Sequence, residues 1–427
     1  MSDAQDVKSS RNLLWMYVYT AIGNLGGGLG SPFVPYYAQE LQFTSLEVGT
    51  LQAASNFFPN AFQLPFGRLS DAIGKRIPFI FLGSLTASFI YILLILNPTP
   101  LVLIILVIVQ QVASSAINPA WNALIGDMST SDTRVKLISY LTLISNVMIL
   151  LAELVFMALA VKANNVSAFK LPFIIAAVLG MASSFVMLLY KEKNTGKVSP
   201  ENKQSFGAPF RDRDLRKLLF AYGIYVFFMS LPWALFYRST VNVVGATNFQ
   251  IGLISAVSTL AVVLTIRPVQ KFIERTGPKW SIAISRIIFV AVPAMYAISR
   301  NVNQLIILNA ITGLGSTLTS IAFIAYILEI APPSNRAAYI GAFNLVSGSV
   351  SLVGSILGGY LGDVFVYQYG VIVGLAVVYV ISTLGRGFSS TFFFYLKDVK
   401  TYPETPLGYF LTRYRTFFNR FSFMRRF

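Results

Sequence analysis

The chain contains no cysteine and no histidine among its 427 residues. Their absence excludes disulfide bonds, thiolate nucleophiles, zinc sites built from the usual ligands and proton relays through imidazole. A nucleotide-binding loop of the Gly-x-x-x-x-Gly-Lys-Ser/Thr type is also missing, so ATP-driven pumping finds no support. We therefore expect that the protein is not an enzyme and that it binds no cofactor or metal ion.

Charged residues are scarce as well. They make up 12% of the chain, whereas 55% is hydrophobic and the mean hydropathy is +0.65. A soluble domain carries about a quarter charged residues. So few charges cannot cover a soluble surface, and we expect an all-α integral membrane protein, since no strand pattern competes with the helical one.

Apolar runs long enough to cross a bilayer recur along the whole chain. The first begins at Leu13 and is too long for a signal peptide. A hydrophilic stretch separates six such runs from six more, which predicts twelve transmembrane helices in two pseudo-symmetric halves. We expect a cytoplasmic N-terminal tail over residues 1–11 and the two six-helix halves over 12–190 and 216–396. The linker between the halves spans residues 191–215, and a basic amphipathic tail spans 397–427.

The net charge of +16 is concentrated in the central linker and the even-numbered connections between runs. The odd-numbered connections are nearly bare, with Lys162, Lys170 and Arg300 as exceptions. This asymmetry is the positive-inside bias of membrane proteins, and it argues against nucleic acid as a partner. We expect a monomer that spans the cell membrane several times, with both termini in the cytoplasm.

Residues 67–76 read Gly-Arg-Leu-Ser-Asp-Ala-Ile-Gly-Lys-Arg and lie between the apolar runs 48–66 and 77–96. Lipid does not tolerate so many ionisable side chains, so we expect a short aqueous turn here. A copy of its spacing follows 203 residues later (274 − 71) and relates Asp71, Gly74 and Arg76 to Glu274, Gly277 and Lys279. An offset of 202 residues (329 − 127) relates Asp127 and Arg134 to Glu329 and Arg336. Two charged patterns at nearly one offset indicate an internal duplication.

The pattern G-x-x-x-D-x-x-G-K-R after a second apolar run resembles the cytoplasmic loop signature of the major facilitator superfamily, whose transporters contain parallel repeats. The resemblance covers about residues 12–396. It implies a twelve-helix carrier whose halves are locked on the cytoplasmic side by charges near the two loops. The residues implied are Gly67, Asp71, Gly74, Lys75, Arg76, Asp127, Arg134, Glu274, Gly277, Glu329 and Arg336. The alternative that these loops only set the topology stays open.

Three features depart from the family pattern. Pro278 replaces the cation at the counterpart of Lys75, and Val107 stands where many members carry an arginine. The fifth expected helix lacks the Gly-Pro-x-x-Gly-Gly element of drug–proton antiporters. These differences weaken a direct transfer of the antiport mechanism.

Glu153 is the one carboxylate deep within an apolar run, and it shares a helix face with Ser139, Thr142 and Asn146. An ionised carboxylate in lipid costs several kcal/mol, so this side chain should face a wet cavity or be protonated. We expect it to be the residue that couples proton movement to transport. The alternative is a hydrogen bond between helices.

Polar and aromatic residues on several expected helices suggest the wall of a solute cavity. Amides in lipid prefer either a cavity or a partner helix, and both roles stay open for each residue. The cavity candidates are Asn24, Asn56, Asn60, Gln63, Gln111, Asn118, Trp121, Asn122, Asn146, Tyr222, Tyr225, Trp233, Asn309 and Asn344. Three intramembrane arginines, Arg238, Arg286 and Arg386, are expected to snorkel to a membrane surface.

In the C-terminal tail, aromatic residues recur at helical spacing and arginines lie largely off that face. This pattern predicts a helix that binds anionic lipid at the membrane surface. A role in binding a protein partner is the alternative.

From these features we predict a secondary transporter that moves a small organic solute by alternating access, coupled to protons. A neutral or amphipathic solute suits a cavity lined by amides and aromatic rings. Export is favoured over import, although the direction depends on coupling. The alternatives are a facilitative uniporter or an importer of a sugar or organic acid, and a transport-dead receptor or scaffold.

Overall fold

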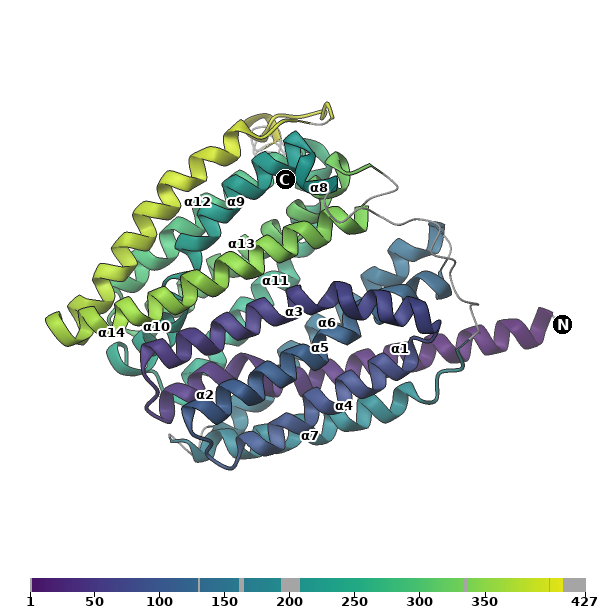
Figure 1. Ribbon diagram of the computed structural model, residues 1–427, viewed down its shortest axis with the longest axis horizontal. Helices are drawn as coiled ribbons and strands as arrows, with labels where there is room; N and C mark the ends of the chain where they lie inside the picture. The colour runs from purple at the N-terminus through teal and green to yellow at the C-terminus, as the bar shows by residue number, and fades with distance from the viewer. Residues whose placement is uncertain are drawn as a thin grey trace, which may run out of the picture.

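The computed structural model describes residues 2–129, 131–160, 165–192, 208–332, 336–398 and 400–409, and every regular element in these ranges is helical. The first half forms one bundle, drawn purple to blue in Figure 1. Its elements are α1 (Ser2–Gly30), η1 (Ser31–Phe33), α2 (Val34–Glu40), α3 (Ser45–Ile73), α4 (Ile77–Leu94), α5 (Pro100–Met128), α6 (Ser131–Ala160) and α7 (Ser167–Met187).

The second half lies beside the first and is drawn teal to yellow in Figure 1. Its elements are α8 (Ala208–Arg211), α9 (Arg213–Ser230), α10 (Trp233–Arg238), the π-helix η2 (Ser239–Val243), α11 (Asn248–Thr276), α12 (Pro278–Ile298), α13 (Val302–Ile330), α14 (Arg336–Ser390) and η4 (Thr391–Tyr395). Each half has an apolar core of its own, and a third apolar cluster joins first-half residues to Ala234, Ala246 and Ile251 of the second half. The halves meet chiefly where α3 packs on α14 and α6 on α11.

Nine helical segments of the described residues are long and apolar enough to cross a membrane. Among them α14 turns at Gly370, whose φ of 77° is not helical, so that its 55 residues form two arms. Helices α1 and α3 have 29 residues each but are less apolar, because both carry many polar side chains. Together these elements are consistent with the twelve predicted spans.

The internal duplication is visible in matched helices. Helices α3 and α11 both have 29 residues and start 203 positions apart (248 − 45), and α5 and α13 both have 29 and start 202 apart (302 − 100). The same capping box begins α3 and α11: Thr44 bonds with Glu47 in the first half, and Thr247 bonds with Gln250 in the second. The two pseudo-symmetric halves predicted from the sequence are therefore confirmed.

The predicted aqueous turn at 67–76 is wrong over most of its length. Helix α3 continues through Gly67 to Ile73, and the chain leaves it at Gly74, whose φ of 71° and ψ of 17° are left-handed. A helix satisfies its own backbone bonds, so it can continue into water past the end of an apolar run. The turn itself is therefore confined to the three residues 74–76.

The two copies of this turn differ because of Pro278. Gly277 has a φ of 87° and a ψ of 160°, whereas the ψ of Gly74 is 17°. A residue before proline is pushed toward extended ψ values, and proline is favoured at the first position of a helix. Pro278 therefore starts α12 directly, whereas α4 starts only at Ile77.

Glycines let the halves approach closely where α3 meets α14. A side chain at Gly49 would come within 2.5 Å of the Ser355 carbonyl oxygen, and one at Gly359 would collide with the Ser45 carbonyl oxygen. Small residues at such crossings permit contact between backbones. Lys203 in the predicted linker, and the predicted amphipathic helix over 410–427, lie outside the described residues.

Candidate transport site and inter-half contacts

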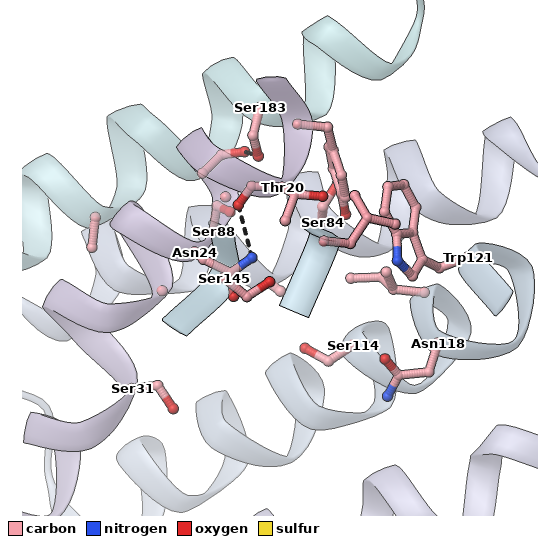
Figure 2. A pocket seen from close by; sticks show the side chains of 18 of the residues that line it. Thr20, Asn24, Ser31, Ser84, Ser88, Ser114, Asn118, Trp121, Ser145 and Ser183 are labelled. Atoms are coloured by element: carbon pink, nitrogen blue, oxygen red, sulfur yellow. Dashed lines mark hydrogen bonds between the residues drawn. The ribbon is translucent and has the colours of Figure 1, made fainter. Parts of the chain in front are cut away.

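A cavity of about 540 Å³ lies within the first half, between α1, α4, α5, α6 and α7. Figure 2 shows hydroxyl and amide side chains from these helices around it. Its polar lining includes Thr20, Asn24, Ser31, Ser84, Ser88, Gln110, Gln111, Ser114, Asn118, Asn122, Thr142, Ser145 and Ser183. Ligand pockets have volumes of about 300–1,000 Å³, so this cavity has room for a small organic molecule.

Among the described residues, no aspartate, glutamate, lysine or arginine lines this cavity. Some of its amides are already engaged: Asn24 donates to the Thr20 carbonyl oxygen at 2.8 Å, and Gln110 donates to that of Ala87 at 2.9 Å. Tyr19 and Trp121 add an aromatic wall, with ring centroids 5.1 Å apart and planes inclined by 40°. This lining therefore combines hydrogen-bonding groups with apolar surface and carries no formal charge.

Five of the predicted cavity residues line this space: Asn24, Gln111, Asn118, Trp121 and Asn122. Serines that the sequence did not single out line it too, among them Ser84, Ser88 and Ser114. In the sequence, the only indication that Ser84 and Ser88 line the cavity is their spacing of one helical turn, which places them on the same helix face. Serines at this spacing also serve ordinary helix packing, so the signal was weak.

Other predicted cavity residues bond along or between helices instead. Asn56, Asn60, Asn146 and Asn309 each donate to the carbonyl oxygen four residues earlier, at 2.7–2.9 Å. Asn344 on α14 donates to Gln63 on α3 at 3.5 Å, which joins the two halves.

The predicted aromatic residues lie in the second half. Tyr225 is fully buried and donates to the Arg286 carbonyl oxygen at 3.1 Å. Tyr222 packs against Phe323 and Phe343, with centroids 4.8 and 4.5 Å away. Trp233 begins α10 and is partly buried. The predicted set therefore splits between the first-half cavity, the inter-half contacts and the second-half core.

Glu153 on α6 lies at the interface between the halves and is 2% exposed. Its Oε1 accepts hydrogen bonds from Ser255 at 2.7 Å and Thr259 at 3.0 Å, both on α11 of the other half. Its Oε2 is buried and has no hydrogen-bond partner within the described part of the chain. Any movement of α6 against α11 must therefore change the surroundings of this carboxyl group.

The prediction that arginines snorkel is wrong for Arg286 and Arg386, which are 0% and 1% exposed inside the second half. Their helices place these two side chains against neighbouring helices, which distance from the end of a span does not reveal. Arg238 is partly exposed and pairs with Asp363.

Side chains of α14, Arg386 among them, donate hydrogen bonds to the carbonyl groups at the break between helices α9 and α10. Pro232 lacks an N–H group, so the carbonyl of Phe228 loses its helical donor. Ser382 donates to that carbonyl oxygen at 2.7 Å, and Arg386 donates to that of Met229 at 2.8 Å. Side chains of α14 therefore replace the missing helical donor and stabilise the break before α10.

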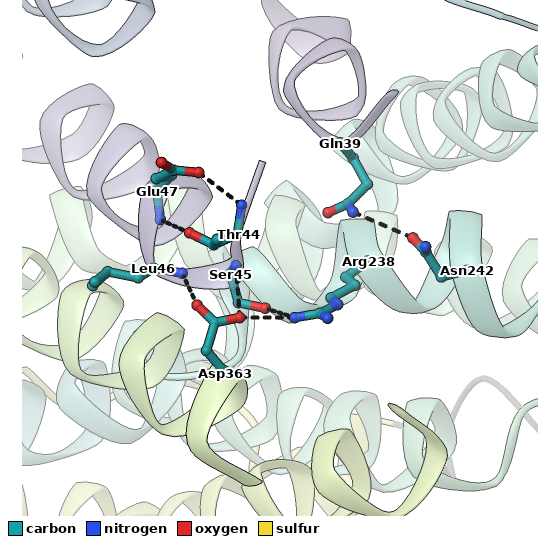
Figure 3. A network of polar contacts seen from close by, with 8 residues as sticks. All are labelled: Gln39, Thr44, Ser45, Leu46, Glu47, Arg238, Asn242 and Asp363. Atoms are coloured by element: carbon teal, nitrogen blue, oxygen red, sulfur yellow. Dashed lines mark hydrogen bonds and ion pairs between the residues drawn. The ribbon is translucent and has the colours of Figure 1, made fainter. Parts of the chain in front are cut away.

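We call the side of the bundle where α3 begins the Asp363 end, and the side where α3 stops the Gly74 end. A helix of 29 residues is about 44 Å long, so the ends lie on opposite faces of the protein. Figure 3 shows the polar contacts at the Asp363 end. There Asp363 accepts from the backbone N–H of Ser45 at 3.0 Å and of Leu46 at 2.8 Å, and from Arg238 at 2.8 Å.

Further contacts close the Asp363 end between the halves. Arg238 donates to the Ser45 hydroxyl at 2.5 Å, and Gln39 donates to Asn242 at 3.3 Å (Figure 3). Gln52 donates to the Tyr237 hydroxyl at 2.9 Å. Because α10 and η2 carry Tyr237, Arg238 and Asn242, this short segment makes most of the polar contacts that join the halves here.

At the Gly74 end of the first half, the motif residues bond within their own half. The Arg76 N–H donates to Glu192 at 2.5 Å, and the Arg76 guanidinium donates to Ser70 at 3.1 Å. Gly67 faces Pro119 of α5, and Lys75 and Asp127 are exposed. The side chains of Asp71 and Arg134 lie outside the part of the chain that the structure describes.

At the same end of the second half, residues 397–398 and 400–409 cover the motif. Tyr402 donates to Glu329 and stands where a side chain at Gly277 would lie. Arg275 pairs with Glu404 at 2.6 Å, and Lys279 pairs with Asp398 at 2.9 Å. Glu274 accepts from Gln270 at 3.0 Å, and Arg336 is exposed. Burial and the neighbouring Glu329 carboxylate raise the pKa of Tyr402 above its ordinary value, so its hydroxyl stays protonated and can donate.

The family model of the Major Facilitator Superfamily matches residues 16–244 and 218–423, so the chain belongs to this family of solute transporters and is a multi-pass membrane protein. An uncharacterized MFS-type transporter of Methanocaldococcus jannaschii is 23% identical over 395 residues, covering 87% of this chain and 97% of the relative.

Solved structures show the same fold. A variant of the nucleoside transporter NupG superposes with a TM-score of 0.74 at 13% identity, covering 91% of this chain and all of that one. A bacterial homolog of the human lysosomal transporter Spinster, inward-facing and unoccupied, superposes with a TM-score of 0.68 at 14% identity, covering 93% of this chain and 99% of that one.

Proposed function

We propose that this carrier moves a small, uncharged organic solute rich in hydroxyl or amide groups, and that the solute binds in the first-half cavity. The observation that supports this most is the lining, which offers many hydrogen-bonding side chains and no formal charge among the described residues. Burying an unpaired ion in such a site is costly, whereas a neutral polar solute exchanges bonds with water for bonds with the lining.

A ligand-dependent stability screen of the purified protein tests this proposal. Sugars, polyols, nucleosides and amino acid amides are compared with organic acids and lipophilic cations at equal concentration. We expect the thermal unfolding midpoint to rise with neutral polar solutes and not with lipophilic cations. A midpoint raised by lipophilic cations alone would contradict the proposal.

We propose that the solute crosses by alternating access and that the present structure is closed at the Asp363 end. The inter-half contacts of Asp363, Arg238, Gln39 and Gln52 support this. On the positive-inside bias we assign the Gly74 end to the cytoplasm, together with both termini. Because the chain has no cysteine, a single cysteine at Lys203 can be labelled selectively. Reaction of that cysteine with an impermeant thiol reagent in sealed cells would reverse the orientation.

We propose that the charges at the Gly74 end form a lock in the opposite state. In the present state Lys75 and Asp127 are exposed, and Glu329 bonds with the C-terminal segment. Lys75 and Asp127 are therefore available to pair when the Gly74 end closes, whereas Glu329 would first have to leave its partners in the C-terminal segment. Asp71→Asn should then lower transport while folding survives, since an exposed ion pair contributes only about 0–1 kcal/mol. If this variant transports at the normal rate, the charges do not form a lock, and the loop serves only to set the membrane topology.

We propose proton coupling through Glu153 as the second part of the function. Its carboxyl group takes both of its hydrogen bonds from the opposite half, so rocking of the halves exchanges those partners for others. Proton affinity depends on hydrogen bonds and on access to water, so proton binding and rocking become linked. Export is the direction we favour, and a uniporter is the alternative if the coupling fails.

A further inference from the structure

Two guanidinium groups lie inside the second half with no acidic partner among the described residues. Arg286 and Arg386 are 0% and 1% exposed. The ion pairs formed by the described residues join other cations, namely Arg238, Arg275, Lys279 and Lys400, to carboxylates near the ends of the bundle. A buried cation is costly unless paired, so each of these two arginines needs an explanation.

Strong acceptors are more numerous at Arg386 than at Arg286. Arg386 donates to two backbone carbonyl oxygens, of Phe289 at 2.7 Å and Met229 at 2.8 Å, while its buried Nε has no partner among the described residues. Arg286 has one strong acceptor, the Thr319 hydroxyl oxygen. Its other contacts are to the Ser285 hydroxyl at 3.4 Å and the Met229 sulfur at 3.9 Å, which are long or weak. Most of its five N–H groups therefore have no strong acceptor within the described residues.

Aromatic rings hold the Arg286 guanidinium in place. Its central carbon is 4.7 Å from the Tyr225 ring centroid, 5.2 Å from that of Phe323 and 5.4 Å from that of Phe289. Ring faces attract a cation but accept few hydrogen bonds, so they keep the charge in the interior without using its donors. The cluster is a fixed cation with spare hydrogen-bonding capacity.

By the spacing of the duplication, both arginines fall close to a pair of serines beside the first-half cavity. Arg286 on α12 and Arg386 on α14 lie 202 residues after Ser84 and Ser184 (286 − 84 and 386 − 184), within one residue of the offsets of 203 and 202 that relate α3 to α11 and α5 to α13. Ser184 donates to Ser84 at 2.8 Å, and Ser84 lines the cavity. The two halves therefore carry opposite chemistry at equivalent positions, neutral hydroxyls in one and guanidinium groups in the other.

We propose that Arg286 and Thr319 form a binding site for an anionic group, either the carboxylate or phosphate of a charged organic solute, distinct from the uncharged solute of the first-half cavity, or a free inorganic anion. The site is closed in this structure. Thr319 and Tyr222, which borders Phe323, are partly exposed, so access opens on their side when the helices rearrange. A planar guanidinium with spare donors suits a carboxylate or phosphate in two-point contact. The site is separate from the first-half cavity and does not depend on it.

Thermal unfolding of the purified full-length protein tests this site with acetate, its neutral isostere acetamide, and inorganic phosphate. Each probe is titrated against the wild type, Arg286→Met and Arg286→Lys in the same buffer. We expect acetate and phosphate to raise the midpoint of the wild type, acetamide to leave it unchanged, and Arg286→Met to lose the response. Arg286→Lys keeps the charge and should bind at least tenfold more weakly. Equal responses of the wild type and Arg286→Lys, or of acetate and acetamide, would overturn the proposal.

A second comparison identifies the source of the anionic group. Glucose 6-phosphate is titrated beside glucose and inorganic phosphate. If glucose 6-phosphate binds at least tenfold more tightly than glucose and phosphate each do, the anionic group belongs to an organic solute. If it binds no more tightly than phosphate, the site binds a free inorganic anion. Thr319→Val, which removes the hydroxyl at nearly constant volume, should weaken phosphate binding in either case. If no probe affects the wild type, the proposal fails, while neutral solutes can still bind in the first-half cavity.

Discussion

Arg238 and Asp363 pair at 2.8 Å at one end of the bundle, and the same carboxylate accepts two backbone N–H groups at the start of α3 in the opposite half. A carboxylate at a helix N-terminus satisfies donors that have no helical partner and interacts favourably with the helix dipole. One ion pair of the second half therefore anchors the first half. This relationship makes Asp363 the centre of the contacts that keep this end shut.

Asp363→Asn should shift the protein toward the state that is open at this end. The amide keeps the shape but loses the charge, so its bonds to Ser45 and Leu46 weaken and Arg238 loses its counterion. Because the two side chains are 19% and 30% exposed, we expect the unfolding free energy to fall by only about 1–2 kcal/mol. Reactivity of a cysteine introduced at Gln52 reports the opening.

Arg275→Gln is the matched control for this change. It removes an ion pair of similar length, the one with Glu404 at 2.6 Å, which lies at the Gly74 end within the second half. Reactivity at position 52 should not change in this variant. An equal increase in both variants would mean that the Asp363 contacts have no special role in closing the bundle.

Gly27→Val should abolish solute binding while the protein stays folded. Gly27 lines the cavity, and a side chain built there meets no atom within 4 Å, so the added methyl groups enter the cavity itself. Gly341→Val is the control, because that glycine also has nothing within 4 Å but does not line the cavity. Binding of the solute that most stabilises the wild type is measured in both. Unchanged binding in Gly27→Val would place the solute elsewhere.

Gly277→Ala should destabilise the protein more than Gly74→Ala. Its φ of 87° with a ψ of 160° is a region that only glycine visits readily, and its new methyl group would lie 2.6 Å from Tyr402. We expect a loss of about 1–3 kcal/mol there, against about 1–2 kcal/mol for the left-handed Gly74. Denaturant unfolding measures both. If Gly74→Ala lost more unfolding free energy than Gly277→Ala, the Tyr402 side chain would have to move away from position 277 at little cost.

Glu153→Gln should uncouple transport from protons without abolishing it. The amide keeps the size of the side chain and still accepts from Ser255 and Thr259, but it does not titrate. Uptake into proteoliposomes driven by an imposed pH gradient should disappear, while exchange of solute without a gradient should persist. If gradient-driven uptake survives in the glutamine variant, Glu153 serves as a hydrogen-bond acceptor between the halves.

The fold was predictable because its signals are local. Hydrophobic runs mark the helices, and the repeat of Asp71 and Gly74 at Glu274 and Gly277 marks the duplication. The contacts between helices were not predictable in the same way. The burial of Arg286 depends on which face of α12 meets α9 and α13, and the partners of Glu153 come from a helix about a hundred residues further along.

The candidate cavity was only partly predictable for a related reason. Large amides such as Asn118 stand out in an apolar helix, whereas serines such as Ser84 are common in helix packing of any kind. The length of α3 was misjudged because its last turns are polar, yet helical hydrogen bonding continues until Gly74 ends it. Composition therefore indicates where lipid ends, not where a helix ends.

Alternating access requires that the first-half cavity open in turn to the two sides of the membrane, and a cysteine at Asn118 reports this opening from each side. Asn118→Cys is the sole thiol of the protein, because the natural chain has no cysteine. Its reaction with an impermeant thiol reagent is followed from each side of sealed membranes. We predict reaction from the cytoplasmic side, slowed by bound solute, and new reaction from the outer side once Asp363→Asn is added. Reaction from neither side, or a pattern that Asp363→Asn and solute leave unchanged, would rule out alternating access of this cavity.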